Sequence, residues 1–389
     1  MKFLHCSDLH LGKKPSFGSE IFKARRFEDY FNAFERIIEQ AKKNNVEAII
    51  VAGDFFDKKE TNPNILINTE KLLQKCKEYK IDVIIIEGNH DLIYKDKEAD
   101  SWIIYLENKE LLKRPLKNKP VIIDTVKFFG LGYPGAYVDD ELLEFAEYCK
   151  ENNICNCVLL VHTAISNNEF IGGFLKDKTV LNKIKNYVIY IAGGHGHKLN
   201  TYPEQSPFFF VPGSPEYYDF GEDSNLKTAI IFDTDLKEHK ILAQHPRNRM
   251  IESVNLDCTS QDEFKKEFNN FLSSLKITNE DIVIIKIKHL KNDFIPDIKW
   301  AESRILEKGA LFAKAELERE NVRFGSVSSN RRSIEEIELE QIKKWDYWSK
   351  AAETAAKALA EMRQSVANGQ DDISHIFDSV LNSIVAGKK

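Results

Sequence analysis

The sequence predicts an α/β protein in which a large layered domain is followed by a small second α/β unit and a helical tail. Three observations lead to this prediction. Short apolar runs alternate with amphipathic helical patterns over roughly the first 235 residues, and the pattern changes near residue 247. Helix-favouring residues then dominate from about residue 333. An alternation of strand, helix and strand is typical of layered α/β domains.

The strands of the first domain are expected where the chain is apolar without interruption. Several of these runs are rich in Val and Ile, as is typical of strands buried on both faces. We expect strands at residues 2–7, 48–52, 83–87, 121–124, 127–130, 158–162, 187–192, 208–211 and 228–233. We expect amphipathic helices at residues 27–44, 64–79 and 139–152.

The second unit is predicted from a new run of strand and helix patterns. Strands are expected at residues 250–256, 281–288 and 311–318, and helices at residues 261–275, which Ser260 would cap, and 298–307. Small polar residues then predict a linker. The predicted domains are therefore 1–240, 246–320, a linker at 321–332 and a tail at 333–389.

The last predicted helix carries a broad apolar stripe. Its residues recur at the i, i+3, i+4 spacing of one helix face, namely Ile373, Ile376, Phe377, Val380, Leu381 and Ile384. Two interpretations remain open. The stripe binds a partner protein, or it packs on the first helix of its own tail.

Composition sets broad limits on the protein class. Hydrophobic residues make up 42% and charged residues 30%, as in an ordinary soluble globular protein. No apolar run approaches the roughly 18 residues of a membrane span. The six cysteines are scattered and fit neither a disulfide framework nor a zinc site, so we expect a cytoplasmic protein. A net charge of −6 does not indicate a nucleic-acid binder, but a local basic surface could still bind one.

Clusters of metal-ligand residues follow five of the predicted strands. Each cluster alone would be an ordinary turn or a core histidine, but five of the ten histidines fall in these clusters. The carboxyl ends of strands in open α/β sheets lie together, so the clusters should converge. Residues two apart on an extended chain also point to the same side. The predicted ligands are Asp8, His10, Asp54, Asn89, His162, His195 and His197.

The ordered motifs Asp-x-His, Gly-Asp, Gly-Asn-His-Asp, His and Gly-His-x-His resemble those of the calcineurin-like metallophosphoesterases. The resemblance implies a four-layer α/β/β/α sandwich with two metal ions, both contacted by Asp54. It assigns Asp8, His10 and His197 to the first ion, and Asn89, His162 and His195 to the second. Mixed oxygen and imidazole ligands suit Mn²⁺, with Mg²⁺ or Fe²⁺ as alternatives. His90 would act as the catalytic general acid.

Arginines that clamp phosphate monoesters in related phosphatases are absent, which leaves phosphodiesters as the expected substrates.

Four segments resemble the SbcD and Mre family of DNA-repair nucleases: residues 5–12 followed by Arg25 and Arg26, 53–57, 88–91, and 212–216 with 219–222. The resemblance implies a homodimeric exonuclease and endonuclease that processes duplex ends, hairpins and single strands in double-strand-break repair. It also implies a capping domain, and a tail that binds an SMC-like ATPase of the SbcC type near the nucleoid.

Some features fit this family less closely. Asp57 stands where some relatives have a histidine, which leaves the balance of exonuclease and endonuclease activity open. Gly196 separates two predicted ligands where relatives usually have a larger side chain.

Lys286 and Lys288 form either a DNA-binding ridge or an ordinary solvated face. The alternative function is a small-molecule phosphodiesterase of the same superfamily.

Overall fold

A computed structural model describes residues 1–92, 101–166, 173–219, 222, 226–288 and 294–318. The chain divides into two compact units, Met1–Glu320 and Asn321–Lys389. The predicted linker, tail and apolar stripe therefore lie outside the described residues. None of the described helices combines the length and apolar character needed to cross a lipid bilayer.

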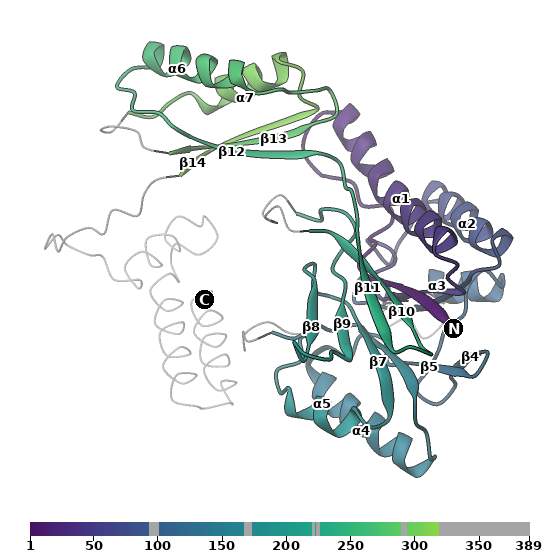
Figure 1. Cartoon of the computed structure of the whole chain (residues 1–389). Helices are drawn as coiled ribbons and strands as arrows, with labels where there is room; N and C mark the ends of the chain where they lie inside the picture. The colour runs from purple at the N-terminus through teal and green to yellow at the C-terminus, as the bar shows by residue number, and fades with distance from the viewer. Residues whose placement is uncertain (93–100, 167–172, 220–221, 223–225, 289–293, 319–389) are drawn as a thin grey trace, which may run out of the picture. The chain divides into compact units, whose positions relative to one another are not determined.

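The first sheet has five strands in the order β11-β10-β1-β2-β3 (Figure 1). Its strands are β1 (Lys2–Cys6), β2 (Ala48–Ala52), β3 (Asp82–Ile86), β10 (Thr228–Asp233) and β11 (Glu238–Ala243). The strands β1, β2 and β3 are parallel, whereas β10 runs antiparallel to β1. The carboxyl ends of these three parallel strands therefore lie at one edge of the sheet.

The second sheet has six strands in the order β4-β5-β6-β7-β9-β8. They are β4 (Val121–Ile123), β5 (Val126–Gly130), β6 (Cys157–Val161), β7 (Val188–Gly193), β8 (Asn200–Tyr202) and β9 (Phe209–Val211). The four central strands β5, β6, β7 and β9 are parallel, and the two edge strands are antiparallel to their neighbours.

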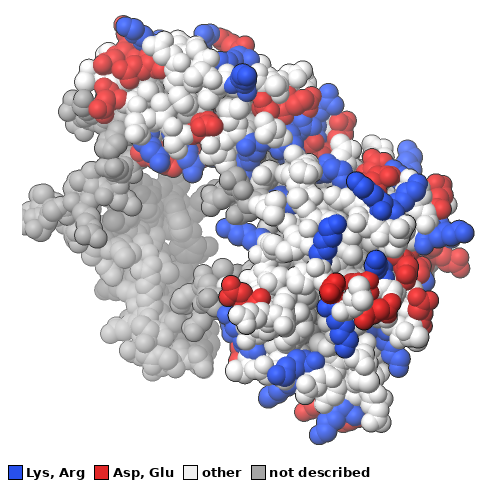
Figure 2. All heavy atoms as spheres, in the orientation of Figure 1, with Lys and Arg blue, Asp and Glu red and all other residues white. Residues whose placement is uncertain are grey.

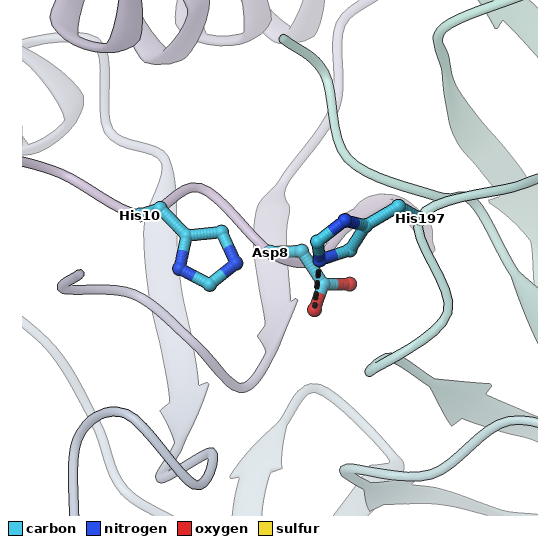
Figure 3. Close-up of side chains that lie close together, drawn as sticks. All are labelled: Asp8, His10 and His197. Atoms are coloured by element: carbon cyan, nitrogen blue, oxygen red, sulfur yellow. Dashed lines mark ion pairs between the residues drawn. The ribbon is translucent and has the colours of Figure 1, made fainter. Parts of the chain in front are cut away.

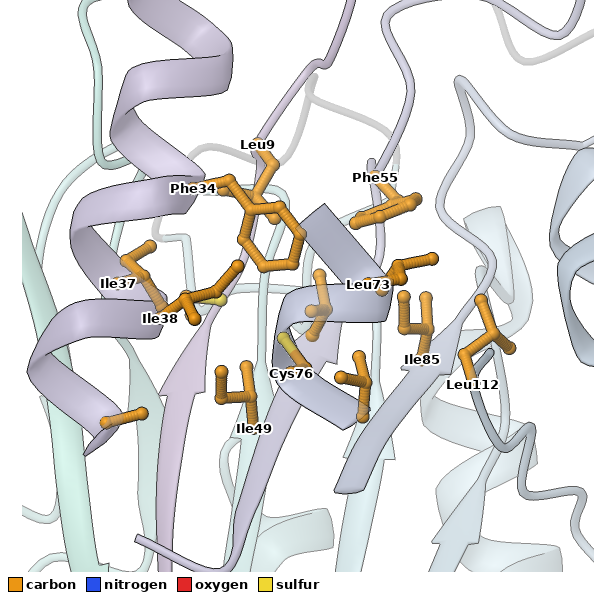
Figure 4. Close-up of a cluster of buried hydrophobic side chains, with 14 of the residues drawn as sticks. Leu9, Phe34, Ile37, Ile38, Ile49, Phe55, Leu73, Cys76, Ile85 and Leu112 are labelled. Atoms are coloured by element: carbon orange, nitrogen blue, oxygen red, sulfur yellow. The ribbon is translucent and has the colours of Figure 1, made fainter. Parts of the chain in front are cut away.

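Three apolar clusters show that the two sheets and their helices form four layers. Helices α1 (Glu20–Lys43), α2 (Pro63–Glu78) and α3 (Trp102–Asn108) cover the outer face of the first sheet (Figure 4). Helices α4 (Val138–Glu151) and α5 (Thr179–Ile184) cover the second sheet, and a 3₁₀ turn, η1 (Gly135–Tyr137), precedes α4. Between the sheets, Phe3 packs on Phe128 and Tyr190 at ring distances of 5.8 and 5.0 Å. The predicted α/β/β/α sandwich is confirmed.

A separate core holds the segment that follows β11. Its three parallel strands are β12 (Arg249–Asn255), β13 (Ile282–Lys288) and β14 (Phe312–Glu318), and its helices are α6 (Gln261–Ser274) and α7 (Ile298–Glu307). The Ser260 hydroxyl accepts the Glu263 N–H, so the predicted cap of α6 is confirmed. Buried ion pairs join this segment to the sandwich, since Arg247 donates to both carboxylate oxygens of Asp29 on α1 at 2.8 and 2.7 Å.

The predicted start of the first helix was wrong, and the prediction missed the short elements α3, α5, η1, β8 and β11. Helix α1 begins at Glu20, not at residue 27, because the Ser19 hydroxyl accepts the Phe22 N–H and caps the first turn. Arg25 and Arg26 therefore lie inside the helix. Strand β11 was not predicted; it is an edge strand whose residues are mostly exposed, and its apolar run is only three residues long.

Candidate metal centre

The predicted ligands follow parallel strands of both sheets. Asp8 and His10 follow β1, Asp54 follows β2, and Asn89 and His90 follow β3. His162 follows β6 of the second sheet, and His195 and His197 follow β7. The structure brings all of them together, because the carboxyl ends of these strands meet where the two sheets face each other.

Three of these side chains converge on one point. Ligand atoms of Asp8, His10 and His197 all lie within 4.8 Å of one another (Figure 3). His197 Nε2 lies 4.0 Å from Asp8 Oδ1. Among the described residues, Asp8 Oδ2 and both ring nitrogens of His10 are buried and have no hydrogen-bond partner. Buried polar atoms without partners are costly, and a cation at this point would satisfy them.

A second group lies beside the first. Ligand atoms of Asp54, His162 and His195 also lie within 4.8 Å of one another. Asn89 joins them, because its Oδ1 lies 3.1 Å from His162 Nε2 and 3.0 Å from His195 Nδ1. Two imidazole nitrogens and an amide oxygen therefore point toward a common position.

Asp54 lies between the two groups. Its Oδ2 is 3.3 Å from His162 Nε2 in the second group and 3.8 Å from His10 Nε2 in the first. Its Oδ1 accepts the backbone N–H of His90 at 2.9 Å, which fixes the carboxylate between the groups. This placement suits a carboxylate that two cations would share.

The protonation of the histidines follows from burial and from Asp54. Burial lowers the pKa of His10 well below its usual value, so this imidazole is neutral, the form that binds metals. Burial also disfavours the charged form of His162, but the Asp54 carboxylate outweighs it and raises the His162 pKa to about 9. A cation bound there would therefore displace a proton.

The backbone at the site is strained. Asp8, His10, Asp54 and His195 have φ values of 55°, 45°, 51° and 67°, in the left-handed region that non-glycine residues rarely adopt. Strain of this kind concentrates at functional sites, where the surrounding structure holds it in place. Gly196, between two predicted ligands, is closely packed, because a Cβ there would lie 2.8 Å from Ala164 Cβ.

Asp91 connects two of the ligand loops. Its buried carboxylate accepts the N–H groups of Phe55 and Phe56, which follow Asp54, at 3.1 and 2.8 Å. It also accepts the N–H of Gly88 at 2.9 Å, just before Asn89. The sequence contained Asp91 in a motif but gave it no role. The three hydrogen bonds hold the loops after β2 and β3 in a fixed relation.

His90 lies next to both groups with a defined tautomer. Its Nδ1 is 2.7 Å from the carbonyl oxygen of Asp57, and a carbonyl can only accept, so Nδ1 carries a proton. Nε2 is then the ring nitrogen left to exchange a proton with a substrate. His90 also lines a cavity of about 430 Å³, whose lining includes Lys13, Lys58 and Arg249.

Tyr218 forms one wall of the site. Its ring centroid lies 4.3 Å from that of His10 and 4.8 Å from that of His197. The Lys13 ammonium lies 3.1 Å from the Tyr218 ring centroid and 3.6 Å from Asp57 Oδ1. Tyr218 therefore packs on two predicted ligands and also lines the cavity.

The predictions of DNA-binding and partner-binding residues have a different outcome from the predictions of metal ligands. Lys286 and Lys288 lie on β13, and each pairs with Glu318 on β14, at 3.4 and 3.3 Å. Their charges are thus partly offset by one carboxylate. Positive and negative side chains are interspersed over the face drawn in Figure 2. The six residues predicted to bind a partner, from Ile373 to Ile384, lie outside the described residues.

Comparisons with known proteins relate this chain to a family of phosphoesterases and to DNA-repair proteins. A model of the calcineurin-like phosphoesterase family matches residues 1–199, just over half of the 389 residues. The DNA double-strand break repair protein Mre11 of Archaeoglobus fulgidus is 23% identical over 369 residues, which cover 88% of this chain and 77% of the relative. The Mre11 of Methanosarcina acetivorans is also 23% identical, over 81% of this chain, but the match spans only 50% of that relative. A solved structure from Thermus thermophilus, TT1561, is 12% identical, with a TM-score of 0.42 over 62% of this chain and 98% of its own.

Proposed function

Because this chain belongs to the calcineurin-like phosphoesterase family, we propose that it is a metal-dependent DNA nuclease that processes ends in double-strand-break repair. The observation that carries the hydrolytic part is the position of Asp54 Oδ2 between His10 and His162, at 3.8 and 3.3 Å. The DNA substrate rests on the similarity to Mre11 proteins, which extends over 88% of this chain in one relative.

Two divalent cations, with Mn²⁺ as the preferred ion, fit the residues present. Asp8, His10 and His197 would hold one, Asn89, His162 and His195 the other, and Asp54 both. The buried atoms of Asp8 and His10 that have no partner support this assignment. When bound, such a pair supplies Lewis acidity to the phosphoryl group and lowers the pKa of a water molecule.

His90 would give a proton to the leaving oxygen. The Asp57 carbonyl oxygen accepts the His90 Nδ1 proton at 2.7 Å, so Nε2 is the ring nitrogen that would exchange a proton with a bound diester. Protonation of the leaving oxygen by a positioned imidazole typically contributes a rate factor of about 10²–10⁴. His90 would therefore act directly on the reacting atoms without being a metal ligand.

A DNA strand would enter through the cavity beside His90. The cavity is lined by cationic side chains from Lys13, Lys58 and Arg249 and by aromatic rings from Tyr217 and Tyr218. Cations attract the phosphates of a polyanion, and rings can stack with exposed bases. A chain of phosphodiesters uses these features better than a small phosphomonoester does.

Partners follow from the same resemblance. The function proposed here includes a homodimer and an SMC-like ATPase bound through the apolar stripe that runs from Ile373 to Ile384. Both interactions remain predictions. The match spans only 50% of the Methanosarcina acetivorans relative, so the wider activity of those proteins is also a proposal for this chain.

The test is cleavage by the purified chain with Mn²⁺. End-labelled duplex DNA, single-stranded DNA and bis-p-nitrophenyl phosphate are offered side by side, and Mn²⁺ content is measured on the same samples. The variants are His90→Asn and, as a matched control, His245→Asn, because His245 is exposed and lies outside the site. We expect His90→Asn to lose at least about 100-fold in DNA cleavage while it retains native Mn²⁺ content.

Each other result has a definite meaning. Loss of Mn²⁺ in His90→Asn would show that His90 is a ligand and that its proposed role is wrong. Turnover of the small diester alone would exclude DNA as the substrate and favour the small-molecule phosphodiesterase. Loss of cleavage in His245→Asn would show that the assay responds to any histidine substitution.

A further inference from the structure

A carboxylate outside the predicted ligand set contacts His197. His197 Nδ1 lies 2.9 Å from Glu222 Oε1, while Nε2 of the same ring faces Asp8 Oδ1 at 4.0 Å. A carboxylate accepts hydrogen bonds, so the proton of the neutral ring resides on Nδ1. The Nε2 lone pair is then directed toward the point where Asp8, His10 and His197 converge.

Glu222 is itself held in place by a buried lysine. Lys227 Nζ donates to Glu222 Oε2 at 2.5 Å and to the Ser214 hydroxyl at 2.8 Å. The Lys227 side chain is only 1% exposed and that of Glu222 only 11%. The Ser214 hydroxyl in turn donates to the carbonyl oxygen of Glu216 at 2.9 Å. The carboxylate therefore has one oxygen on the histidine and the other on a fixed cation.

This chain of contacts gives a role to a motif that the reaction does not otherwise use. The segments at residues 212–216 and 219–222, which resemble the SbcD and Mre family, supply none of the predicted metal ligands. Lys227 joins the two by bonding both Ser214 and Glu222. Lys227 therefore links both segments, through Glu222, to the predicted ligand His197.

We propose that Glu222 is a positioning residue for the metal centre, which sets the tautomer and orientation of His197 and is anchored by Lys227. The inference rests on the proposed metal centre. Histidine ligands commonly donate their second ring N–H to a carboxylate, and loss of that partner typically lowers metal affinity by about 10–100-fold. Glu222 acts only through His197, so its effect is confined to one of the two cation positions.

A double-mutant cycle on Mn²⁺ binding tests this role. Metal-free protein is titrated with Mn²⁺ by calorimetry, for native chain and for Glu222→Ala. We expect Glu222→Ala to weaken one binding step by about 10–100-fold. In a His197→Ala background the same substitution should change Mn²⁺ affinity less than about twofold, because the group it positions is gone. In a His195→Ala background the full effect should remain.

Two further variants separate positioning from folding. Glu222→Gln keeps an acceptor for the His197 N–H, so it should retain more Mn²⁺ affinity than Glu222→Ala. Glu35→Ala is the matched control, because Glu35 also pairs with a lysine: its Oε1 lies 2.7 Å from Lys75 Nζ. This variant should bind Mn²⁺ with native affinity. Circular dichroism and thermal unfolding in chelator confirm that each variant is folded, and Glu222→Gln replaces Glu222→Ala in the cycle if the latter unfolds.

The outcomes that would overturn the inference differ from those that would overturn the function. Native chain that binds no Mn²⁺ would refute the metal centre, and the role of Glu222 with it. Native binding with an unaffected Glu222→Ala variant would refute only the role of Glu222. An equal loss in the His197 and His195 backgrounds would show a general effect on the fold and would also refute it.

Discussion

Replacing Arg26 should destabilise the protein far more than replacing its neighbour Arg25. Arg26 is 4% exposed and donates to Asp29 at 2.8 Å, to Glu216 at 3.1 Å and to the carbonyl oxygen of Tyr217 at 2.7 Å. Arg26→Met would leave the Glu216 carboxylate, itself 1% exposed, without its closest cation. Removing one partner of a buried ion pair costs about 3–5 kcal/mol, so we expect that loss in the free energy of unfolding.

Arg25 provides a control of the same residue type on the same helix. Its side chain is 49% exposed, and its contact with Glu28, at 3.4 Å, is an exposed pair. Exposed pairs contribute about 0–1 kcal/mol, so Arg25→Met should lie within that range. The assay is urea unfolding of metal-free protein, followed by circular dichroism. A loss below about 1 kcal/mol for Arg26→Met, or equal losses for both variants, would refute the argument from burial.

Two other substitutions address the pH dependence of stability and the position of Asp54. Burial lowers the pKa of His5 from 6.5 to about 3, so the unfolded chain binds more protons between these values, and stability falls as pH drops below 6.5. The glutamine in His5→Gln cannot titrate. Between about pH 7.5 and about pH 5, the free energy of unfolding of this variant should therefore fall by about 2 kcal/mol less than that of the native chain. Equal pH dependence of the two unfolding free energies would contradict this. In Gly88→Ala, the new Cβ would lie 2.2 Å from Asp54 Oδ1. We therefore expect at least about a tenfold loss of Mn²⁺ affinity, measured by calorimetry. Native affinity would mean that the loop around residue 88 shifts without moving Asp54.

The positions of the ligands along the strands could be predicted because that information is local. Continuous apolar runs mark buried strands, and parallel strands place the residues after their carboxyl ends at one edge. Asp54 lies two residues after the end of such a run, β2, and its place at the sheet edge follows from this alone. The start of α1 was harder to predict, because the Ser19 side-chain hydrogen bond, not apolar periodicity, sets it.

Contacts between distant segments could not be predicted, because hydrogen bonds leave no periodic signal in the sequence. Arg26 reaches Glu216, which lies 190 residues further along the chain, and His197 reaches Glu222, which follows it by 25 residues. Only the folded chain decides which of many polar side chains meet.

The sequence by itself determined the layered fold, the residues at the ends of its strands and the chemistry those residues favour. The tertiary structure alone decided that Asp54 Oδ2 lies between His10 of the first group and His162 of the second. The reason is physical: β1 and β6 belong to different sheets, and the apolar layer that packs between the sheets sets the distance between the two groups.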